Sequence, residues 1–464
     1  MIGRSGYYQS GGAFGFRDQL QDTLGLKFLN PDILKRQIIY HSKHQFLEGD
    51  VEHWWHEESK RGIRTKISDD LLWMVYVVIE YINFTGDKNI LYEETEYLKG
   101  NVLKDNEEER YEKYSSTSEK ESIFKHCIRA IDKSLNFGKN GLPKIGTGDW
   151  NDGLNKVGNK GNGESVWLGF FLYYILHHFS KICEELGEKQ ISERYERIKE
   201  ELKKKLNTNA WDGRWYRRAF TDEGNILGSI QNEECRIDSI AQSWSVISNA
   251  GDNDKKFIAM ESLDSHLIDW ENGIIKLLDP PFEKCNINPG YIKSYLPGVR
   301  ENGGQYTHAA IWVIIAECLL GFKDKAEELF EMINPIEHSK TKEMIKKYKV
   351  EPYVMSADIY GRENLIGQGG WSWYTGSASW YYKVGIEYIV GLKIENGYMK
   401  IEPNIPVKWK EVDIKYKYKK TTYNIHINNE NIDCKIEYIK INGIKEKNNI
   451  KLDGEEEEYF IEVG

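Results

Sequence analysis

Apolar residues recur along most of this chain in pairs of segments with helical spacing. The first segment of a pair is apolar on nearly every side, and the second is apolar along one stripe. These are the patterns of a buried helix and of a helix that covers it. The buried segments span about 68–87, 164–186, 236–250 and 304–320, and the striped segments span 190–207, 253–267 and 323–334. Because long loops separate the pairs and no sequence repeat is visible, the pattern predicts a ring of α-hairpins.

Other segments carry helix signals of the same kind. Pro31 suits the start of a helix at 31–43, and Ser68 suits the N-cap of the buried helix that follows it. Further helices are expected at 16–26, 117–137 and 376–392, with a short one inside the charged stretch 90–113.

The pattern changes after residue 392. From there Ile, Tyr and Val alternate with Lys and Glu, and Asn-Gly and Asn-Asn dipeptides interrupt the alternation. Such a pattern is typical of hairpins. The chain is therefore predicted to be mainly α, with a helical domain over 1–392 and a small antiparallel β-domain over 393–464.

Composition narrows the range of functions. The 63 Lys and Arg against 73 Asp and Glu give a net charge of −10, which argues against a nucleic-acid partner. Aromatic residues make up 13% of the chain, and many fall in glycine-rich loops, as on carbohydrate-binding surfaces. Six cysteines without CxxC spacing indicate reduced, buried thiols. With no signal peptide and no membrane segment visible, we expect a soluble, cytoplasmic protein.

The most distinctive stretch is GTGDWNDGLN at 146–155. Asp149 and Asp152 flank Trp150, and Gly148 and Gly153 allow a tight turn around them. An indole can stack on a sugar ring, and a carboxyl kept partly dry can protonate a glycosidic oxygen. The alternative is a turn in which both aspartates only accept bonds from nearby backbone N–H groups.

Two stretches nearer the N-terminus add polar side chains. Asp18 lies beside Arg17 at the start of a helix, either as an acceptor for sugar hydroxyls or as half of a structural Arg–Asp pair. The motif His-Trp-Trp-His at 53–56 has further His and Glu nearby, but it lacks the ligand spacing of a zinc site. An aromatic wall for a sugar and plain loop packing both remain open, and no metal is expected.

Two later stretches run from glycine-rich loops into helices. Arg300, Glu301 and His308 surround one helix start, and Thr375 and Gly376 stand at another, where backbone N–H groups favour anions. A structural histidine and a simple threonine N-cap are the alternatives. One candidate acid, several donors and no obvious second carboxylate favour phosphate as nucleophile, because phosphate is already ionised whereas water needs a general base.

Six motifs, in order, resemble glycoside hydrolase family 94, the inverting β-glucoside phosphorylases such as cellobiose, cellodextrin and chitobiose phosphorylases. They are SGGAFGFRDQLQD (10–22), RGIRTKISDDLLW (61–73), GTGDWNDGLNKVG (146–158), GESVW (163–167), PGVRENGGQYTHAAIW (297–312) and GGWSWYTGSASW (369–380). The FRDQLQD segment is most similar to the phosphorylase-like domain of cyclic β-1,2-glucan synthases. Gly12 stands where cellobiose-type members carry an arginine, which argues against a strict cellobiose preference.

The resemblance implies an (α/α)6 barrel that converts a β-linked gluco-oligosaccharide and phosphate into α-glucose 1-phosphate and a shortened sugar, with inversion and without a cofactor. Asp152 would be the general acid, with Asp149 as an organiser of its loop. The implied sugar-binding residues are Asp18, Trp150, Arg300 and Glu301, and the implied phosphate-binding residues are His308, Thr375, Gly376 and Arg4.

Two further expectations concern completeness and chemistry. Family members carry an N-terminal β-sandwich, a linker and a first barrel helix ahead of the GRSGYYQSGG segment, so we expect a barrel without its first helix, as a homodimer or with a partner polypeptide that supplies the missing region. The alternatives to phosphorolysis are an inverting hydrolase on the same barrel, with Glu301 as its second carboxylate, and an inactive carbohydrate-binding fragment of a larger β-glucan phosphorylase or cyclic glucan synthase.

Overall fold

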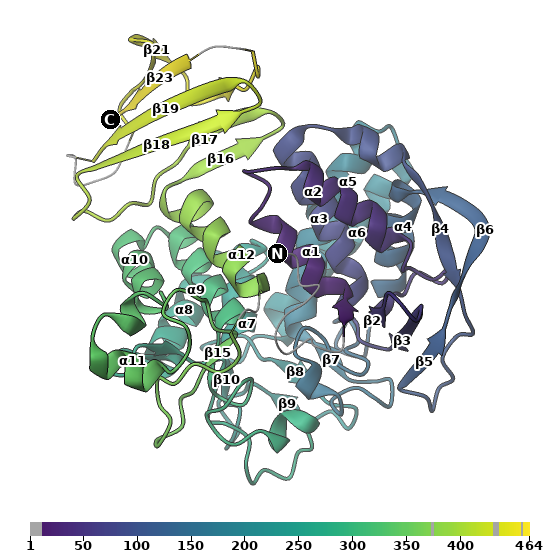
Figure 1. Cartoon of the computed structure of the whole chain (residues 1–464). Helices are drawn as coiled ribbons and strands as arrows, with labels where there is room; N and C mark the ends of the chain where they lie inside the picture. The colour runs from purple at the N-terminus through teal and green to yellow at the C-terminus, as the bar shows by residue number, and fades with distance from the viewer. Residues whose placement is uncertain (1–11, 373–374, 430–435, 456–457) are drawn as a thin grey trace.

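Helices arranged in a ring make up most of the molecule (Figure 1). The computed structural model describes residues 12–372, 375–429, 436–455 and 458–464. In this part of the chain six helices form the inner ring: α1 (Phe16–Leu24), α3 (Asp70–Thr85), α5 (Val166–Glu185), α7 (Ser239–Ile247), α9 (Thr307–Leu320) and α12 (Thr375–Val384). Each contacts the next, and α12 contacts α1. The inner ring is therefore closed, and the expected loss of a first helix does not interrupt it.

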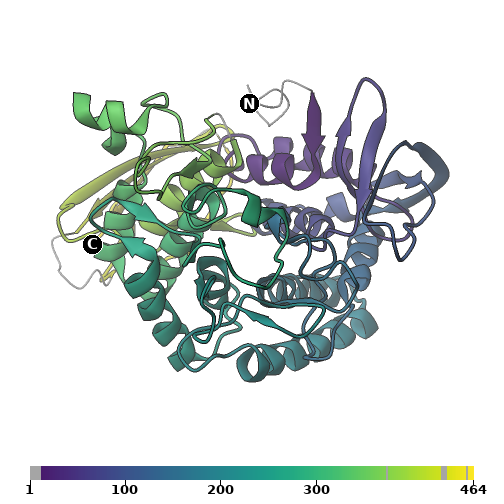
Figure 2. The ribbon, with the colours of Figure 1, turned by 90° about the horizontal axis from the view of Figure 1, so that it is seen from below.

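A second layer of helices packs outside the ring, as the view from below shows (Figure 2). Its members among the described residues are α2 (Asp32–Ser42), α4 (Ile123–Ser134), α6 (Lys189–Asn209), α8 (Asn253–Leu267) and α10 (Lys323–Met332). Each contacts the inner helix that precedes it in the chain. The inner helices are buried on nearly every side and the outer ones along one stripe, as the hydrophobic pattern predicts. The short α11 (Lys342–Tyr348) lies in the loop before α12.

Tryptophans from different helices fill the axis of the ring. Trp312 of α9 is fully buried, and its ring lies 6.2 Å from that of Trp167, 5.4 Å from that of Trp244 and 5.8 Å from that of Trp380, measured between centroids. Trp150 of the 146–155 loop approaches the same ring at 4.9 Å. Because these large side chains bury much apolar surface, they fix the helices around one core and seat the loop upon it.

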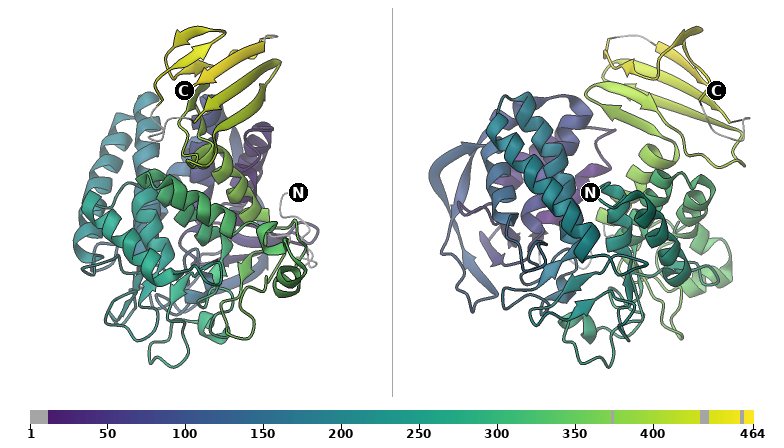
Figure 3. Two further views of the ribbon diagram at one scale, coloured as in Figure 1. Left: turned by 90° about the vertical axis from the view of Figure 1, so that its left-hand side faces the viewer. Right: turned by 180° about the vertical axis from the view of Figure 1, so that it is seen from behind.

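Long loops and short strands collect at one end of the ring, and the C-terminal sheets lie at the other (Figures 1 and 3). A four-stranded sheet at the loop end is made by β1 (Ala13–Gly15), β2 (Glu52–His56), β3 (Arg61–Thr65) and β5 (Glu109–Lys113). Strands β4 (Glu94–Lys99) and β6 (Ser115–Ser122) pair with each other beside the outer helices α2 and α4 (Figure 1). The remaining short strands of the helical part are β7 (Glu164–Ser165), β8 (Ala219–Phe220), β9 (Ile226–Leu227), β10 (Ile237–Asp238), β11 (Ile268–Asp269), β12 (Ile274–Ile275), β13 (Leu278–Asp279), β14 (Gln305–Tyr306) and β15 (Asp358–Ile359).

Several local predictions were wrong. The stretch 90–113 contains only the end of the 3-10 helix η1 (Lys88–Tyr92) and then forms β4 and β5, and the first residues of 117–137 belong to β6, which pairs with β4. Helix α4 begins only at Ile123, where the side chain of Ser122 accepts a bond from the N–H of Lys125. Ser68 is not an N-cap, because Asp69 takes that position and the Ser68 hydroxyl donates to the carbonyl of Gly148 at 3.0 Å.

The C-terminal part forms two small sheets, and the purely antiparallel prediction was wrong. One sheet contains β16 (Leu392–Glu395), β17 (Tyr398–Ile401) and β22 (Ile450–Lys451). The other contains β18 (Glu411–Tyr418), β19 (Thr421–Asn428), β23 (Glu458–Val463), β20 (Ile439–Ile441) and β21 (Ile444–Glu446). Strand β23 pairs parallel to β19, because the chain crosses through β22 in the first sheet before it returns beside β19. The two sheets share a hydrophobic core of their own, and Phe28 and Phe84 from the helical part pack into it.

Two further predictions concern the cysteines and the membrane. Every cysteine in the described part of the chain is free, and Cys127, Cys183, Cys235 and Cys318 are buried, which confirms the reduced thiols there. Cys434 lies outside the described residues. Among the described helices, none combines the length and the apolar character that a membrane crossing requires.

Candidate active site

The 146–155 loop is held by a buried ion pair. Asp149 is fully buried, and its two carboxylate oxygens accept bonds from Arg218 at 2.7 and 2.6 Å. The hydroxyl of Ser165 and the backbone N–H of Asn151 also donate to Asp149, at 2.6 and 3.0 Å. Burial alone would raise the pKa of Asp149, but Arg218 and these donors lower it below the usual value. Asp149 is thus an ionised anchor for the loop.

The loop also needs glycine at one position. Gly146 has a φ of +61°, and a Cβ at this residue would collide with the carbonyl oxygen of Lys66. The backbone N–H of Thr147 donates to the same oxygen at 3.2 Å. The loop therefore lies directly against the segment that leads into α3.

Asp152 is the partly open carboxyl of this loop. It begins the short 3-10 turn η2 (Asp152–Leu154), and its side chain is 31% exposed. Arg17 of α1 donates to one oxygen of Asp152 and also to both oxygens of Asp69, at 3.0 and 3.1 Å. The same guanidinium reaches the backbone carbonyl of Asp149 at 3.2 Å. Arg17 thus fixes the position of Asp152 against the ring.

Trp150 lies mostly inside the protein. Only 8% of it is exposed, and its ring packs against Tyr306, His308 and Trp312, with centroids 5.2, 6.0 and 4.9 Å away. Most of the indole face expected to meet a sugar is therefore used for packing. The residue instead links the Asp152 loop to the start of α9.

His308 and Gly376 lie together, as the sequence predicts. A Cβ on Gly376 would stand 2.6 Å from Nε2 of His308 and 3.7 Å from the carboxylate of Asp22, so only glycine leaves space there. Burial, with a smaller effect of Arg17, lowers the pKa of His308 to about 3. At neutral pH His308 is therefore an uncharged imidazole. Helix α12 begins at Thr375, whose side chain lies outside the described residues, as does Arg4.

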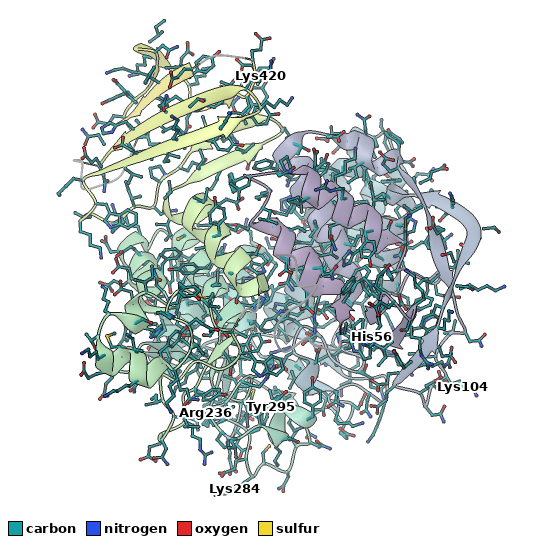
Figure 4. All side chains as sticks on the ribbon, viewed as in Figure 1. His56, Lys104, Arg236, Lys284, Tyr295 and Lys420 are labelled. Atoms are coloured by element: carbon teal, nitrogen blue, oxygen red, sulfur yellow. The ribbon has the colours of Figure 1, made fainter. Side chains whose placement is uncertain are left out.

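Of the three other predicted sugar-binding residues, Arg300 and Glu301 lie on a neighbouring loop and Asp18 lies in α1. Arg300 donates to Glu301 at 3.2 Å, and its guanidinium lies 3.8 Å above the ring of Trp371 and 5.2 Å from that of Tyr295 (labelled in Figure 4). Asp18 is half-buried in the first turn of α1 and points back toward the N-terminal end of that helix.

Tyr291 connects this group to the general-acid candidate. Burial, followed by the charges of Asp152 and Glu301, raises the pKa of Tyr291. The backbone N–H of Tyr291 donates to the side-chain oxygen of Asn155 at 3.0 Å, so the loop at 287–305 meets the 146–155 loop. Van der Waals space is tight there, because a Cβ on Gly153 would stand 2.8 Å from Ile292.

The sequence did not reveal the groups that surround Asp152 most closely. His53 of β2 lies 2.8 Å from Asp70 through Nδ1 and 3.8 Å from Asp152 through Nε2. Burial opposes a charge on His53, but Asp70 and Asp152 outweigh it and raise its pKa to about 9. The sequence predicts an aromatic wall or plain loop packing for the His-Trp-Trp-His motif, and a helix start for the paired aspartates after Ser68. Two acidic residues at a helix N-terminus near that motif were the available signal.

The family of the chain follows from comparison with known proteins. The chain belongs to the glycoside hydrolase 94 family, since residues 1–391 match the Glycosyl hydrolase 94 superfamily, catalytic domain. It is 43% identical over 431 residues to the cyclic beta-(1,2)-glucan synthase NdvB of Rhizobium meliloti (strain 1021), which covers 93% of this chain and 15% of the synthase. It is 28% identical over 439 residues to the solabiose phosphorylase of Paenibacillus borealis, which covers 92% of this chain and 53% of that enzyme.

The matches differ in how much of each known protein they cover. The chain spans about half the length of the phosphorylase and a much smaller share of the synthase. Among solved structures, the GH78 family rhamnosidase of Bacillus sp. GL1 aligns with a TM-score of 0.56 and 11% identity, over 97% of this chain and 40% of the rhamnosidase. At that identity the likeness concerns the fold alone, and it agrees with the ring of helices.

Proposed function

We propose that this chain catalyses the inverting phosphorolysis of β-linked gluco-oligosaccharides to α-glucose 1-phosphate and a shortened sugar. The observation that carries the proposal is the position of Asp152. It is a partly exposed carboxyl on a rigid loop, and the indole of Trp150 connects that loop to the neighbouring His308. This connection supports assigning the acid for the leaving oxygen and the residues for the anion to one site.

The proposed reaction needs one proton donor and one bound anion. Asp152 protonates the glycosidic oxygen as its bond to the anomeric carbon breaks, and a phosphate oxygen forms a new bond to that carbon from the opposite face. The N–H groups at the start of α12, near Gly376, favour a negative charge. A neutral His308 contributes one N–H donor, and we assign Thr375 and Arg4 to the same phosphate. Phosphate needs no general base because it is already ionised.

The sugar side of the site is proposed from the remaining residues. We assign Asp18, Arg300 and Glu301 to the hydroxyl groups of the substrate, because a carboxylate and an Arg–Glu pair supply both acceptors and donors. We further propose β-1,2-linked glucans as the substrate class. The name of the 43% identical relative, a cyclic beta-(1,2)-glucan synthase, supports this choice.

A hydrolase on the same fold would need a second carboxylate with room for water. In inverting hydrolases that spacing is ~6.5–9.5 Å. Glu301 is the candidate, but it accepts a bond from Arg300 and is only 9% exposed. A carboxylate held in this way is a weaker base for water than a free one, so phosphorolysis is the better-supported function.

Phosphate dependence tests the proposal directly. The chain is incubated with β-1,2-, β-1,3- and β-1,4-linked glucobioses, with and without phosphate, and glucose 1-phosphate and glucose are measured. We expect glucose 1-phosphate only with phosphate, and fastest from the β-1,2 linkage. Glucose release without phosphate would establish a hydrolase instead. Saccharide binding without turnover in either condition would establish a binding fragment.

A further inference from the structure

The carboxylate of Asp152 lies between two cations. Arg17 of α1 donates to Oδ1, and Nε2 of His53 lies 3.8 Å from Oδ2. Nδ1 of His53 is bonded to Asp70 of α3 at 2.8 Å. The charged groups that face the His53 ring are therefore Asp70, Asp152 and, more weakly, Arg17. Three separate segments of the chain position this histidine against the proposed acid.

The cluster around Asp152 has more carboxylates than cations. Asp69, Asp70 and Asp152 together carry three negative charges when ionised, against the two positive charges of Arg17 and a protonated His53. Such a cluster attracts an additional proton near neutral pH. Asp69 reflects this, because burial raises its pKa to about 7 even though Arg17 opposes the shift.

We propose that His53 is the proton-positioning residue that supplies Asp152 during phosphorolysis. The Nε2 proton of the imidazolium moves to Oδ2 of Asp152, which leaves a neutral ring whose Nδ1–H still points at Asp70. Asp152 then passes a proton to the glycosidic oxygen as the bond to the anomeric carbon breaks and the phosphate–carbon bond forms. The attacking hydrogen phosphate releases its own proton to solvent as the glucose 1-phosphate dianion forms, and solvent returns one proton to His53, so the cycle is balanced. The inference rests on the proposed role of Asp152 as the acid.

The transfer is favoured when substrate fills the site. An ion pair loses hydration when water is displaced, whereas moving the proton from His53 to Asp152 cancels both charges. The present 3.8 Å separation is longer than a hydrogen bond, and it requires closure by about 1 Å or one bridging water. Contacts of this kind often tighten only in the complex with substrate. The free enzyme thus stores the proton on His53, and the bound enzyme uses it on Asp152.

The competing explanation is that the His53–Asp70 contact only ties β2 to α3. Both explanations allow a loss of stability on mutation, so stability does not separate them. If His53 supplies the proton, the loss of rate at high pH follows the titration of the His53–Asp152 pair. A tie between β2 and α3 predicts no change in that limb.

His53→Gln provides the kinetic test, with His56→Gln as its matched control on the same strand. The ring of His56 (labelled in Figure 4) is hydrogen-bonded to the hydroxyl of Tyr111 at 3.0 Å and packs edge-on against Trp54, away from Asp152 in the contacts that the structure gives for it. We expect His53→Gln to lower kcat by roughly 10–100-fold with KM values within about twofold, a part of the usual effect of an acid–base group. The basic limb should move to lower pH by more than about one unit, because the carboxyl must then hold the proton alone.

Histidine NMR tests the same contact without turnover. The His53 signal is identified by its loss in His53→Gln, and its titration is compared between wild type and Asp152→Asn. We expect the midpoint to fall by about one pH unit or more once the Asp152 charge is gone. Either of two results overturns the proposal that His53 supplies the proton: an unchanged titration midpoint, or a pH–rate profile of His53→Gln like that of His56→Gln. A wild-type chain that forms no glucose 1-phosphate contradicts the proposed function instead, and the NMR result still decides on the coupling.

Discussion

Arg218→Met tests whether the 146–155 loop depends on its buried ion pair. Arg218 is fully buried, donates twice to Asp149, and lies 3.3 Å from Asp238 through Nε. Methionine has a similar length and no charge, so the variant removes the cation and retains much of the packing. Two buried carboxylates then lose their common partner.

The size of the effect follows from that burial. Asp149 is 0% and Asp238 is 1% exposed, so water cannot replace the guanidinium. Removal of one partner from a buried pair costs about 3–5 kcal/mol. Burial already raises the pKa of Asp238 to about 6 although Arg218 opposes the shift, and loss of the cation raises it further. We therefore expect the free energy of unfolding to fall by about 3–5 kcal/mol at pH 7.

Urea denaturation followed by tryptophan fluorescence measures this loss, and the adjacent residue supplies the control. Arg217 donates to Asp212 at 2.8 Å, but its side chain is 24% exposed, so Arg217→Met should cost about 1 kcal/mol or less. The double variant Arg218→Met with Asp149→Asn should cost less than the sum of its parts, because the unpaired anion is removed. Equal losses for Arg217→Met and Arg218→Met would refute the role of the pair.

Three further predictions use the site itself. Asp152→Asn should lower kcat by roughly 10²–10⁴-fold and leave the fold and sugar binding largely intact, and wild-type rates would remove Asp152 from the role of acid. Gly376→Ala places a methyl group 2.6 Å from Nε2 of His308, so the KM for phosphate should rise on the order of tenfold, measured at saturating sugar. Folding raises the pKa of His53 from 6.5 to about 9. Its contribution of about 3 kcal/mol to the free energy of unfolding is therefore fully present below pH 6.5 and is lost as the pH rises to 9. The difference in unfolding free energy between wild type and His53→Gln should shrink over that range, and a constant difference would contradict the shift.

The helical ring could be predicted from the sequence because burial leaves a strong local pattern. Helix α9 is apolar on almost every side, and α6 is apolar along one stripe. The hairpin of β4 and β6 could not be predicted, since most residues of β6 are exposed and polar and show no alternation. The parallel pairing of β23 with β19 depends on a return from another sheet, for which no local signal exists.

The candidate site was predictable only where chemistry lies in one short motif. The residue types of Asp149, Trp150 and Asp152 were enough to single out this loop. The ion pair of Asp149 with Arg218 agrees with the expected role of Asp149 as an organiser of the loop. Asp152 contacts Arg17 and His53, which both lie about a hundred residues or more before it in the chain. No spacing in the sequence marks either residue as its partner. The neutrality of His308 results from burial, which the motif does not encode.

The two halves of the proposed site come from opposite ends of the chain, and closure of the ring joins them. Helix α1 supplies the cation that holds Asp152, and α12 supplies Gly376 beside His308. The seam between these helices is polar: the hydroxyl of Ser379 donates to the carbonyl of Gln21 at 2.9 Å and accepts from the N–H of Gly25 at 2.6 Å. Directional bonds fix the mutual position of two helices more strictly than apolar contact alone. The proposed acid and the residues proposed to bind phosphate therefore reach their spacing only when the first and last inner helices meet.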